Sequence, residues 1–343
     1  MKRFLILLVC AMLAVQPLAA PAGAEGQHPA RYSASFLGSF DTVTAIVGIS
    51  ESKAAFTEAA MAIRTTLEEL HRLFDIYNSY EGINNLKTVN DNAGVAPVQV
   101  DRRIIDLLLF CRETASVTGG LVDVTQGSVL RLWHDARVYS TAFPEDAYLP
   151  TDAELAEAAH HTGFDKLIID ETASTVYLTD PAARLDVGAV AKGYAVELAA
   201  AQMPDNMMLS VGGNIRAKGR NTLTGDRWTA GVEDPEGGEY LHVVWLEDGS
   251  IVTSGDYRRY FTVDGVRYGH IIDPRTRQPG RLWRAVCILC ENSGIADALS
   301  TALYLLPAEE GQQLLEIYGA EAMWIAQDGE CLYSDGFLAL VKP

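Results

Sequence analysis

Between residues 207 and 290 the chain consists mostly of short strand-like segments separated by Gly-rich turns. Helical patterns precede and follow this region, so helices and strands come in mixed blocks without a steady strand–helix–strand alternation. This order favours an α+β domain with largely antiparallel sheets over a doubly wound fold. We therefore predict an α+β architecture.

Apolar residues recur at helical spacing in several segments. The clearest is the segment 53–77, where Phe56, Ile63 and Leu70 fall on one helical face. The other predicted helices span residues 103–117, 151–160, 189–200, 295–306 and 308–318. Strands are expected at residues 32–50, 322–326 and 337–341 and just before Asp186, and a hairpin at residues 167–178.

The N-terminus has the pattern of a secretory signal peptide. Lys2 and Arg3 precede an apolar stretch at residues 4–15, and Ala22-Gly23-Ala24 supplies a small-residue cleavage site. The apolar stretch is shorter than the ~20 residues that cross a bilayer. Cys10 lies inside this stretch, which disfavours a lipid anchor. We expect a signal peptide at residues 1–24, one domain at residues 25–343, and an exported, soluble protein of a bacterial periplasm.

The chain is strongly acidic, with a formal net charge of −18. Removing residues 1–24 takes away two basic residues and no acidic one, which changes the charge to −20. Such a chain repels a phosphate backbone, so nucleic acid is excluded as an expected partner. Binding of a nucleotide would depend on a cation or on local backbone amides.

Cys287 and Cys290 form a Cys-x-x-Cys pattern inside a predicted strand. Residues three apart face opposite sides of a strand, and no second Cys pair or nearby His completes a zinc site. Buried structural cysteines are therefore favoured, and a disulfide in an oxidising compartment is the alternative.

Four distant segments place small residues beside charged or hydroxyl-bearing ones: residues 186–193, 253–257, 270–274 and 296–301. In the first, backbone amides at a helix start suit an anion, and Lys192 can neutralise its charge while Asp186 accepts a hydrogen bond. A tight turn with an ordinary surface lysine explains this segment better when it is taken alone.

Asp297 and Thr301 are four residues apart in a predicted helix and share one face. A carboxylate and a hydroxyl one turn apart, with free carbonyls from a loop, form a hard-oxygen site that suits Mg²⁺. The alternative is a buried Thr bonded to its own helix. Together and in this order, the four segments indicate a Mg²⁺-dependent enzyme acting on a pyrophosphate-containing nucleotide.

These segments resemble the ApbE-type FAD:protein FMN transferases. The resemblance extends over nearly the whole mature chain and includes Phe40-Asp41-Thr42, residues 120–125, Leu132-Trp133 and Gly212-Gly213-Asn214. It implies an ApbE-like (T-fold-like) domain of mostly antiparallel sheets packed with helices. It also implies a periplasmic, Mg²⁺-dependent enzyme that cleaves FAD, transfers FMN to a Thr or Ser hydroxyl of an acceptor protein and releases AMP. The implied acceptors are subunits of membrane redox complexes with a Thr/Ser-Gly-Ala-Thr-like motif.

The resemblance also implies roles for individual residues. His270 resembles the catalysis-linked histidine of the family, near the pyrophosphate, and Tyr77 and Ile271 would pack near the flavin or adenine. Which group deprotonates the acceptor is open among His270, Asp256 and Asp273. The implied FAD contacts are Asp186, Lys192, Leu121, Val122 and Asp123, and the implied Mg²⁺ ligands are Asp297, Thr301 and the backbone carbonyl of Ala189.

The chain departs from the family pattern at a few positions. Leu121-Val122 replaces a usual Ala-Phe or Gly-Phe, Ser128 stands where Pro is common, and Gly294 stands where some members carry an extra acidic residue. Two other functions use the same residues: an exported FAD-binding protein without transferase activity, and an FAD pyrophosphatase that releases FMN to water. An intact Asp297–Thr301 pair favours an enzyme, since simple binding would not require it.

Overall fold

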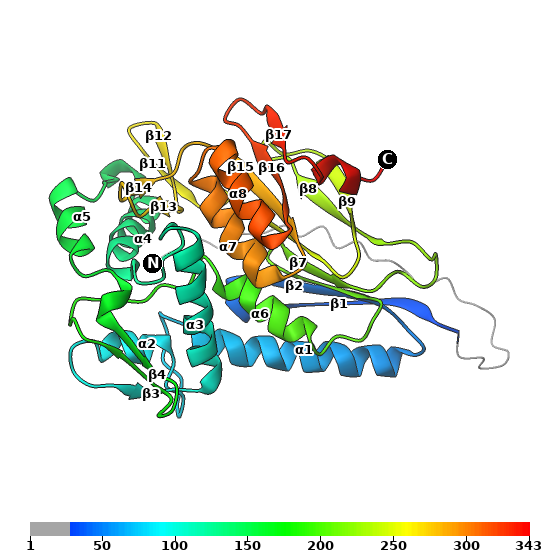
Figure 1. Cartoon of the computed structure of the whole chain (residues 1–343), viewed down its shortest axis with the longest axis horizontal. Helices are drawn as coiled ribbons and strands as arrows, with labels where there is room; N and C mark the ends of the chain where they lie inside the picture. Colours follow the sequence, from blue (N-terminus) through cyan, green and yellow to red (C-terminus); the bar gives the residue numbers. More distant parts are fainter. Residues whose placement is uncertain (1–27) are drawn as a thin grey trace.

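The structure, a computed structural model, describes residues 28–343. An eight-stranded sheet forms its centre, with the order β1-β2-β6-β7-β10-β15-β16-β17 and antiparallel pairing throughout (Figure 1). The predicted α+β class with mostly antiparallel sheets is therefore confirmed. The strands are β1 (Ala30–Leu37), β2 (Val43–Ser50), β6 (Met207–Val211), β7 (Asn214–Lys218), β10 (Ser250–Gly255), β15 (Ala285–Cys290), β16 (Glu321–Ile325) and β17 (Cys331–Tyr333).

Helices cover one face of this sheet, and a hairpin covers the other (Figure 1). The helices are α1 (Lys53–Phe74), α3 (Arg102–Val117), α6 (Ala191–Ala200), α7 (Ser293–Tyr304) and α8 (Ala308–Tyr318). Their apolar faces form one large core with the sheet. The hairpin β8 (Trp228–Glu233) and β9 (Tyr240–Leu246) forms a second core with the opposite face.

The strand β15 shows why both faces are needed, because all six of its residues are buried. Val286, Ile288 and Cys290 belong to the helix-side core, whereas Cys287 lies in the hairpin-side core. The prediction that Cys287 and Cys290 face opposite sides of a strand is confirmed. Both are free thiols, so they are structural rather than disulfide-bonded.

The remaining elements form the left part of the molecule in Figure 1. A third core, which includes Val129, Trp133, Leu155 and Phe261, joins the helices α4 and α5 to a small hairpin, β11–β12. These elements are α2 (Leu86–Asp91), α4 (Gly127–Ala142), α5 (Asp152–Ala159), β3 (Val98–Gln99), β4 (Leu167–Asp170), β5 (Thr175–Leu178), β11 (Tyr260–Val263), β12 (Val266–Gly269), β13 (Ile272–Asp273), β14 (Gln278–Pro279) and the 3₁₀ turns η2 (Pro144–Asp146) and η3 (Phe164–Lys166). Two other 3₁₀ turns lie elsewhere: η1 (Ser39–Asp41) connects β1 to β2, and η4 (Phe337–Leu340) contacts β9.

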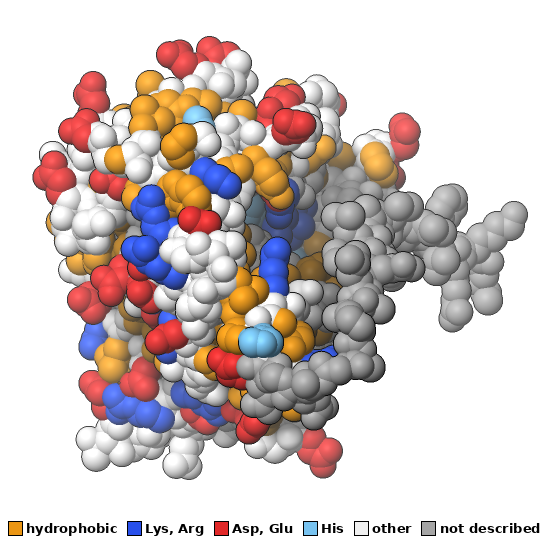
Figure 2. Space-filling view, turned by 90° about the vertical axis from the view of Figure 1, so that its right-hand side faces the viewer, with side chains coloured by type: hydrophobic (Ala, Val, Ile, Leu, Met, Phe, Trp, Pro, Cys, Tyr) orange, Lys and Arg blue, Asp and Glu red, His pale blue; other side chains and the backbone are white. Residues whose placement is uncertain are grey.

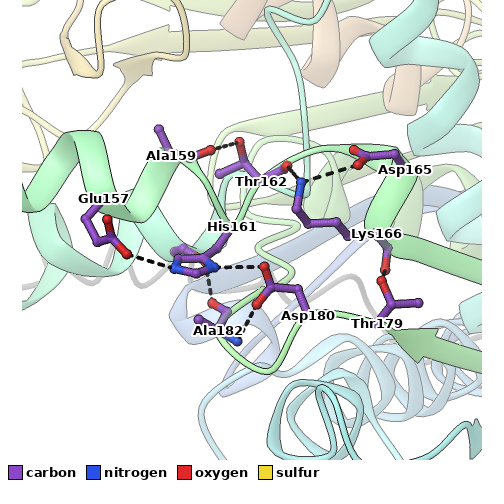
Figure 3. Close-up of polar contacts among 10 residues, drawn as sticks. Glu157, Ala159, His161, Thr162, Asp165, Lys166, Thr179, Asp180 and Ala182 are labelled. Carbon is purple, nitrogen blue, oxygen red and sulfur yellow. Dashed lines mark hydrogen bonds and ion pairs between the residues drawn. The ribbon is translucent and has the colours of Figure 1, made fainter.

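A polar cluster attaches the end of α5 to the β4–β5 hairpin (Figure 3). Nδ1 of His161 lies 2.8 Å from a carboxylate oxygen of Asp180, and Glu157 lies 3.6 Å from the other ring nitrogen. Nζ of Lys166 donates to the carbonyl of Thr162 at 2.7 Å. The pKa of the His161 imidazole is raised, chiefly by the hydrogen bond to Asp180.

Most predicted helices are confirmed, and the errors fall where turns or short elements interrupt a pattern. The single strand expected at residues 32–50 is instead the hairpin β1–β2, because Gly38 and Phe40 adopt positive φ and reverse the chain. The strand expected at 337–341 is the 3₁₀ turn η4. The segment before Asp186 forms only an isolated bridge between Gln126 and Arg184. Helices α2 and α4 were not predicted.

The proposed signal peptide at residues 1–24, and with it the domain boundary at residue 25, lies outside the described residues. Within residues 28–343, no helix combines the length and the apolar character that crossing a bilayer requires.

Candidate active site

One cavity of about 690 Å³ lies between the sheet, the helices α4, α6 and α7, and the β11–β12 hairpin. Its volume is in the range of small-molecule and cofactor sites. Lys and Arg side chains gather among hydrophobic ones around a hollow on the face drawn in Figure 2. All predicted site residues except Asp256 and Asp273 line this cavity: Tyr77, Leu121, Val122, Asp123, Asp186, Ala189, Lys192, His270, Ile271, Asp297 and Thr301.

The close approach of α6 and α7 positions Asp297. A Cβ at Gly193 would lie 2.3 Å from the carbonyl oxygen of Ser293 and 2.5 Å from Cβ of Asp297, so only glycine fits there. The Gly193 amide donates to Oδ2 of Asp297 at 2.8 Å. An amide that the sequence assigned to an anionic ligand is thus used by a carboxylate of the protein itself.

Lys192 supplies the positive charge beside this carboxylate. Its Nζ lies 3.5 Å from Oδ1 of Asp297 and donates to Oδ1 of Asn214 at 2.8 Å. Asp297 is only 3% exposed. A buried carboxylate requires compensation by a cation or by hydrogen bonds, and Asp297 has both.

The predicted metal ligands fit a hard divalent cation by the chemistry of their donors. Asp297, Thr301 and Ala189 line the same cavity and offer a carboxylate, a hydroxyl and a carbonyl oxygen. The Ser300 hydroxyl, rather than that of Thr301, donates to the carbonyl of Asp297, at 2.8 Å. Within residues 28–343, no cluster of three or more His, Cys, Asp or Glu side chains forms a rival metal site.

Aromatic and acidic groups lie at another part of the wall. The Tyr77 ring is 55% exposed and stacks on His134 with ring centroids 5.1 Å apart. Burial raises the pKa of the Asp186 carboxyl, while the amide of Gly188, which donates to it at 2.8 Å, lowers that pKa. Asp123 accepts from the amide and hydroxyl of Thr125 at 2.8 and 2.6 Å, so it also shapes its own loop.

His270 lies inside the cavity and is accessible from its lumen. The protein packed around the exposed ring and then the nearby charges of Arg259, Arg137 and Lys192 lower the pKa of this imidazole to about 3. The imidazole is therefore neutral near pH 7, in the form that accepts a proton.

The structure does not bring Asp256 and Asp273 to this cavity wall. Asp256 accepts from Nη1 of Arg284 at 2.6 Å, and Asp273 accepts from Nη2 of Arg275 at 2.7 Å. Both carboxylates are thus occupied by arginines. Their role as the general base remains a prediction, and the geometry favours His270.

Sequence reasoning missed the cavity residues His134, Arg137 and Arg259. His134 and Arg137 are three residues apart on α4, and Nη2 of Arg137 lies 3.3 Å from Nδ1 of His134. The i, i+3 spacing of two basic groups was the available signal. This spacing is informative only on a helix, and the sequence pattern did not predict α4.

The fold and the cavity together define a class of protein. It is an α+β protein whose cavity presents cations and hard-oxygen donors to a ligand.

Comparisons with known proteins narrow this class. The model of the ApbE family matches residues 40–324. The FAD:protein FMN transferase of Treponema pallidum is 33% identical to this chain, and the alignment covers 82% of this chain and 83% of the relative. The FAD:protein FMN transferase of Vibrio cholerae is also 33% identical, and the alignment covers 78% of this chain and 78% of the relative. The crystal structure of the ApbE protein of Thermotoga maritima superposes with a TM-score of 0.80 at 29% identity, over 92% of this chain and all of the other. The flavin transferase ApbE of Vibrio cholerae gives a TM-score of 0.75 at 28% identity, over 91% of this chain and all of the other.

The chain therefore belongs to the ApbE family.

Proposed function

We propose that this protein is an FAD:protein FMN transferase, which cleaves FAD in a Mg²⁺-dependent reaction and attaches FMN to a Thr or Ser hydroxyl of an acceptor protein. The observation that carries the proposal is the buried Asp297 in the cavity, with Lys192 at 3.5 Å and Thr301 on the same wall. The names of the curated relatives point to the same activity.

In the proposed reaction, the acceptor oxygen bonds to the FMN phosphorus, the bond from that phosphorus to the bridging anhydride oxygen breaks, and AMP leaves. The hydroxyl proton passes to a base, for which neutral His270 in the cavity is the first candidate. Phosphoryl transfer depends mainly on positioning and charge neutralisation. Lys192 contributes positive charge, and a Mg²⁺ held by Asp297, Thr301 and the Ala189 carbonyl would neutralise phosphate charge.

The remaining wall residues are proposed to hold FAD. Tyr77 offers an exposed aromatic ring for stacking, Ile271 an apolar contact, and Asp186 a hydrogen-bond acceptor. Residues 121–123 line the same space. We also propose that the protein is exported to the periplasm and that its acceptors are subunits of membrane redox complexes with a Thr/Ser flavinylation motif.

The test is to incubate the protein with FAD, Mg²⁺ and a candidate acceptor, and to look for fluorescent protein bands and released AMP. Free FMN and AMP without labelled protein would show a pyrophosphatase, and tight FAD binding without cleavage would show a carrier.

The variant Asp297→Asn, which removes the charge and keeps the shape, should lose at least 100-fold in rate and lose its response to Mg²⁺. The matched control is Asp135→Asn, an exposed carboxylate on α4 paired with Arg131 at 3.5 Å, which should keep the wild-type rate. Full activity of Asp297→Asn would overturn the metal assignment.

A further inference from the structure

Arg137 and Arg259 both line the cavity, yet within residues 28–343 neither forms an ion pair with a carboxylate. Arg258, which lines the same cavity, and Arg284, which directly precedes β15, differ in this respect. Arg258 pairs with Glu233, and Arg284 pairs with Asp256. In a chain with 45 acidic and 27 basic residues, two unpaired cations on one wall are not explained by a shortage of carboxylates.

The two positively charged guanidinium groups repel each other. The pKa of Arg137 is lowered, first by burial and then by the charge of Arg259. A guanidinium stays protonated in proteins, so this unfavourable interaction persists until an anion neutralises it.

The packing of α4 against the β11–β12 hairpin restrains Arg137 at the cavity wall. Trp133, on the same face of α4, packs against Phe261 and Tyr268 of the β11–β12 hairpin, with ring centroids 6.4 and 6.1 Å apart. Arg259 directly precedes β11. The packing of α4 against the hairpin therefore fixes both arginines on the same side of the cavity, and the His134 contact at 3.3 Å orients the Arg137 side chain.

We propose that Arg137 and Arg259 form a second anion site in the cavity, separate from Lys192 and Asp297, and that it binds a phosphate group of a nucleotide. A planar guanidinium fork matches two phosphate oxygens, and two such forks can hold one phosphate from two sides. After burial, the charges of Arg259, Arg137 and Lys192 contribute to lowering the pKa of the His270 imidazole, and all four residues line the cavity. The assignment of that phosphate to FAD rests on the proposed function, whereas phosphate binding itself does not.

The test compares ligands with and without phosphate in the absence of Mg²⁺, by calorimetry or flavin fluorescence. In the double variant Arg137→Gln/Arg259→Gln, affinity for AMP and FMN should fall at least tenfold, while affinity for adenosine and riboflavin should stay within twofold. The dependence of FMN affinity on salt should also weaken, because fewer charges contact the phosphate. The control is Arg267→Gln, whose guanidinium lies over the Tyr260 ring at 4.1 Å and does not line the cavity.

Two results would overturn the proposal. AMP and FMN affinities within twofold of wild type would show that the arginines do not bind phosphate. An equal fall for adenosine and riboflavin would show a structural role, which urea unfolding of the double variant checks independently. If the wild-type protein transfers no FMN but the double variant loses affinity for AMP selectively, the anion site stands and the proposed function fails.

Discussion

Replacement of Gly193 by Ala tests whether the close packing of α6 on α7 positions the candidate metal ligand. The new Cβ would lie 2.3 Å from the carbonyl oxygen of Ser293 and 2.5 Å from Cβ of Asp297. Normal contacts lie near 3.5–4.0 Å, so the two helices must separate by about 1 Å. That movement also breaks the 2.8 Å bond from the Gly193 amide to Asp297.

The expected cost follows from three contributions. Overpacking costs about 1–3 kcal/mol, the lost hydrogen bond to a charged group about 1.5–3 kcal/mol, and the better helix propensity of Ala returns about 1 kcal/mol. We expect Gly193→Ala to lower the free energy of unfolding by about 1.5–5 kcal/mol in urea titrations. It should also weaken the Mg²⁺ response, because Asp297 moves.

The control is Gly294→Ala on the facing helix, where the nearest atom to the new Cβ is Oδ1 of Asn292 at 3.2 Å. Its unfolding midpoint should stay near wild type, within about 1 kcal/mol in stability. Wild-type stability and an unchanged Mg²⁺ response in Gly193→Ala would refute the reasoning that this contact positions Asp297.

Three further outcomes are expected. His270→Gln should lower the rate of FAD cleavage at least 100-fold, whereas Asp256→Asn should retain more of the rate; the reverse order in a steady-state assay would make Asp256 the base. Because the pKa of His270 is lowered to about 3, protonation of this ring should not change the wild-type rate between pH 5 and 8. His161→Gln should destabilise the fold by about 0.5–1 kcal/mol at pH 6 and by less at pH 9, because a raised His pKa gives stability that is complete below the unfolded-state pKa and is lost as pH rises through the folded-state pKa. Equal losses of unfolding free energy at both pH values in urea titrations would contradict the Asp180 ion pair as the cause. Asn85→Ala should cost about 2–4 kcal/mol, because Asn85 is fully buried, caps α2 and donates to two backbone carbonyls; a loss below about 1 kcal/mol by thermal or urea unfolding would show that these groups find other partners.

The site prediction agrees with the structure for residues that lie close together in the sequence and on one helix. Asp297 and Thr301 share a wall of the cavity because four residues make about one helical turn, and this relation is local. Asp256 and Asp273 were candidates for the base because they lie in the segments 253–257 and 270–274, which were singled out for their charged or hydroxyl-bearing residues. Whether they reach the cavity depends on distant arginines: Arg284 directly precedes β15, the strand that pairs with β10, and its ion pair with Asp256 occupies that carboxylate.

Local sequence patterns were sufficient to predict most individual helices and strands. Apolar residues at helical spacing predicted α1, and period-two alternation placed Cys287 and Cys290 on opposite faces of β15. These features depend on interactions within a few residues, which a sequence pattern records directly.

Which charged side chains lie close together depends on the folded arrangement of the whole domain. Lys192 lies 3.5 Å from Asp297 across more than one hundred residues of chain, and Arg137 and Arg259 line one cavity from separate elements. Such distances follow from sheet order and from how helices pack on the sheet, and a deviation of about 1 Å decides whether an ion pair forms. No pattern of spacing along the chain contains that information, which is why the anion site with Arg137 emerged only from the folded molecule.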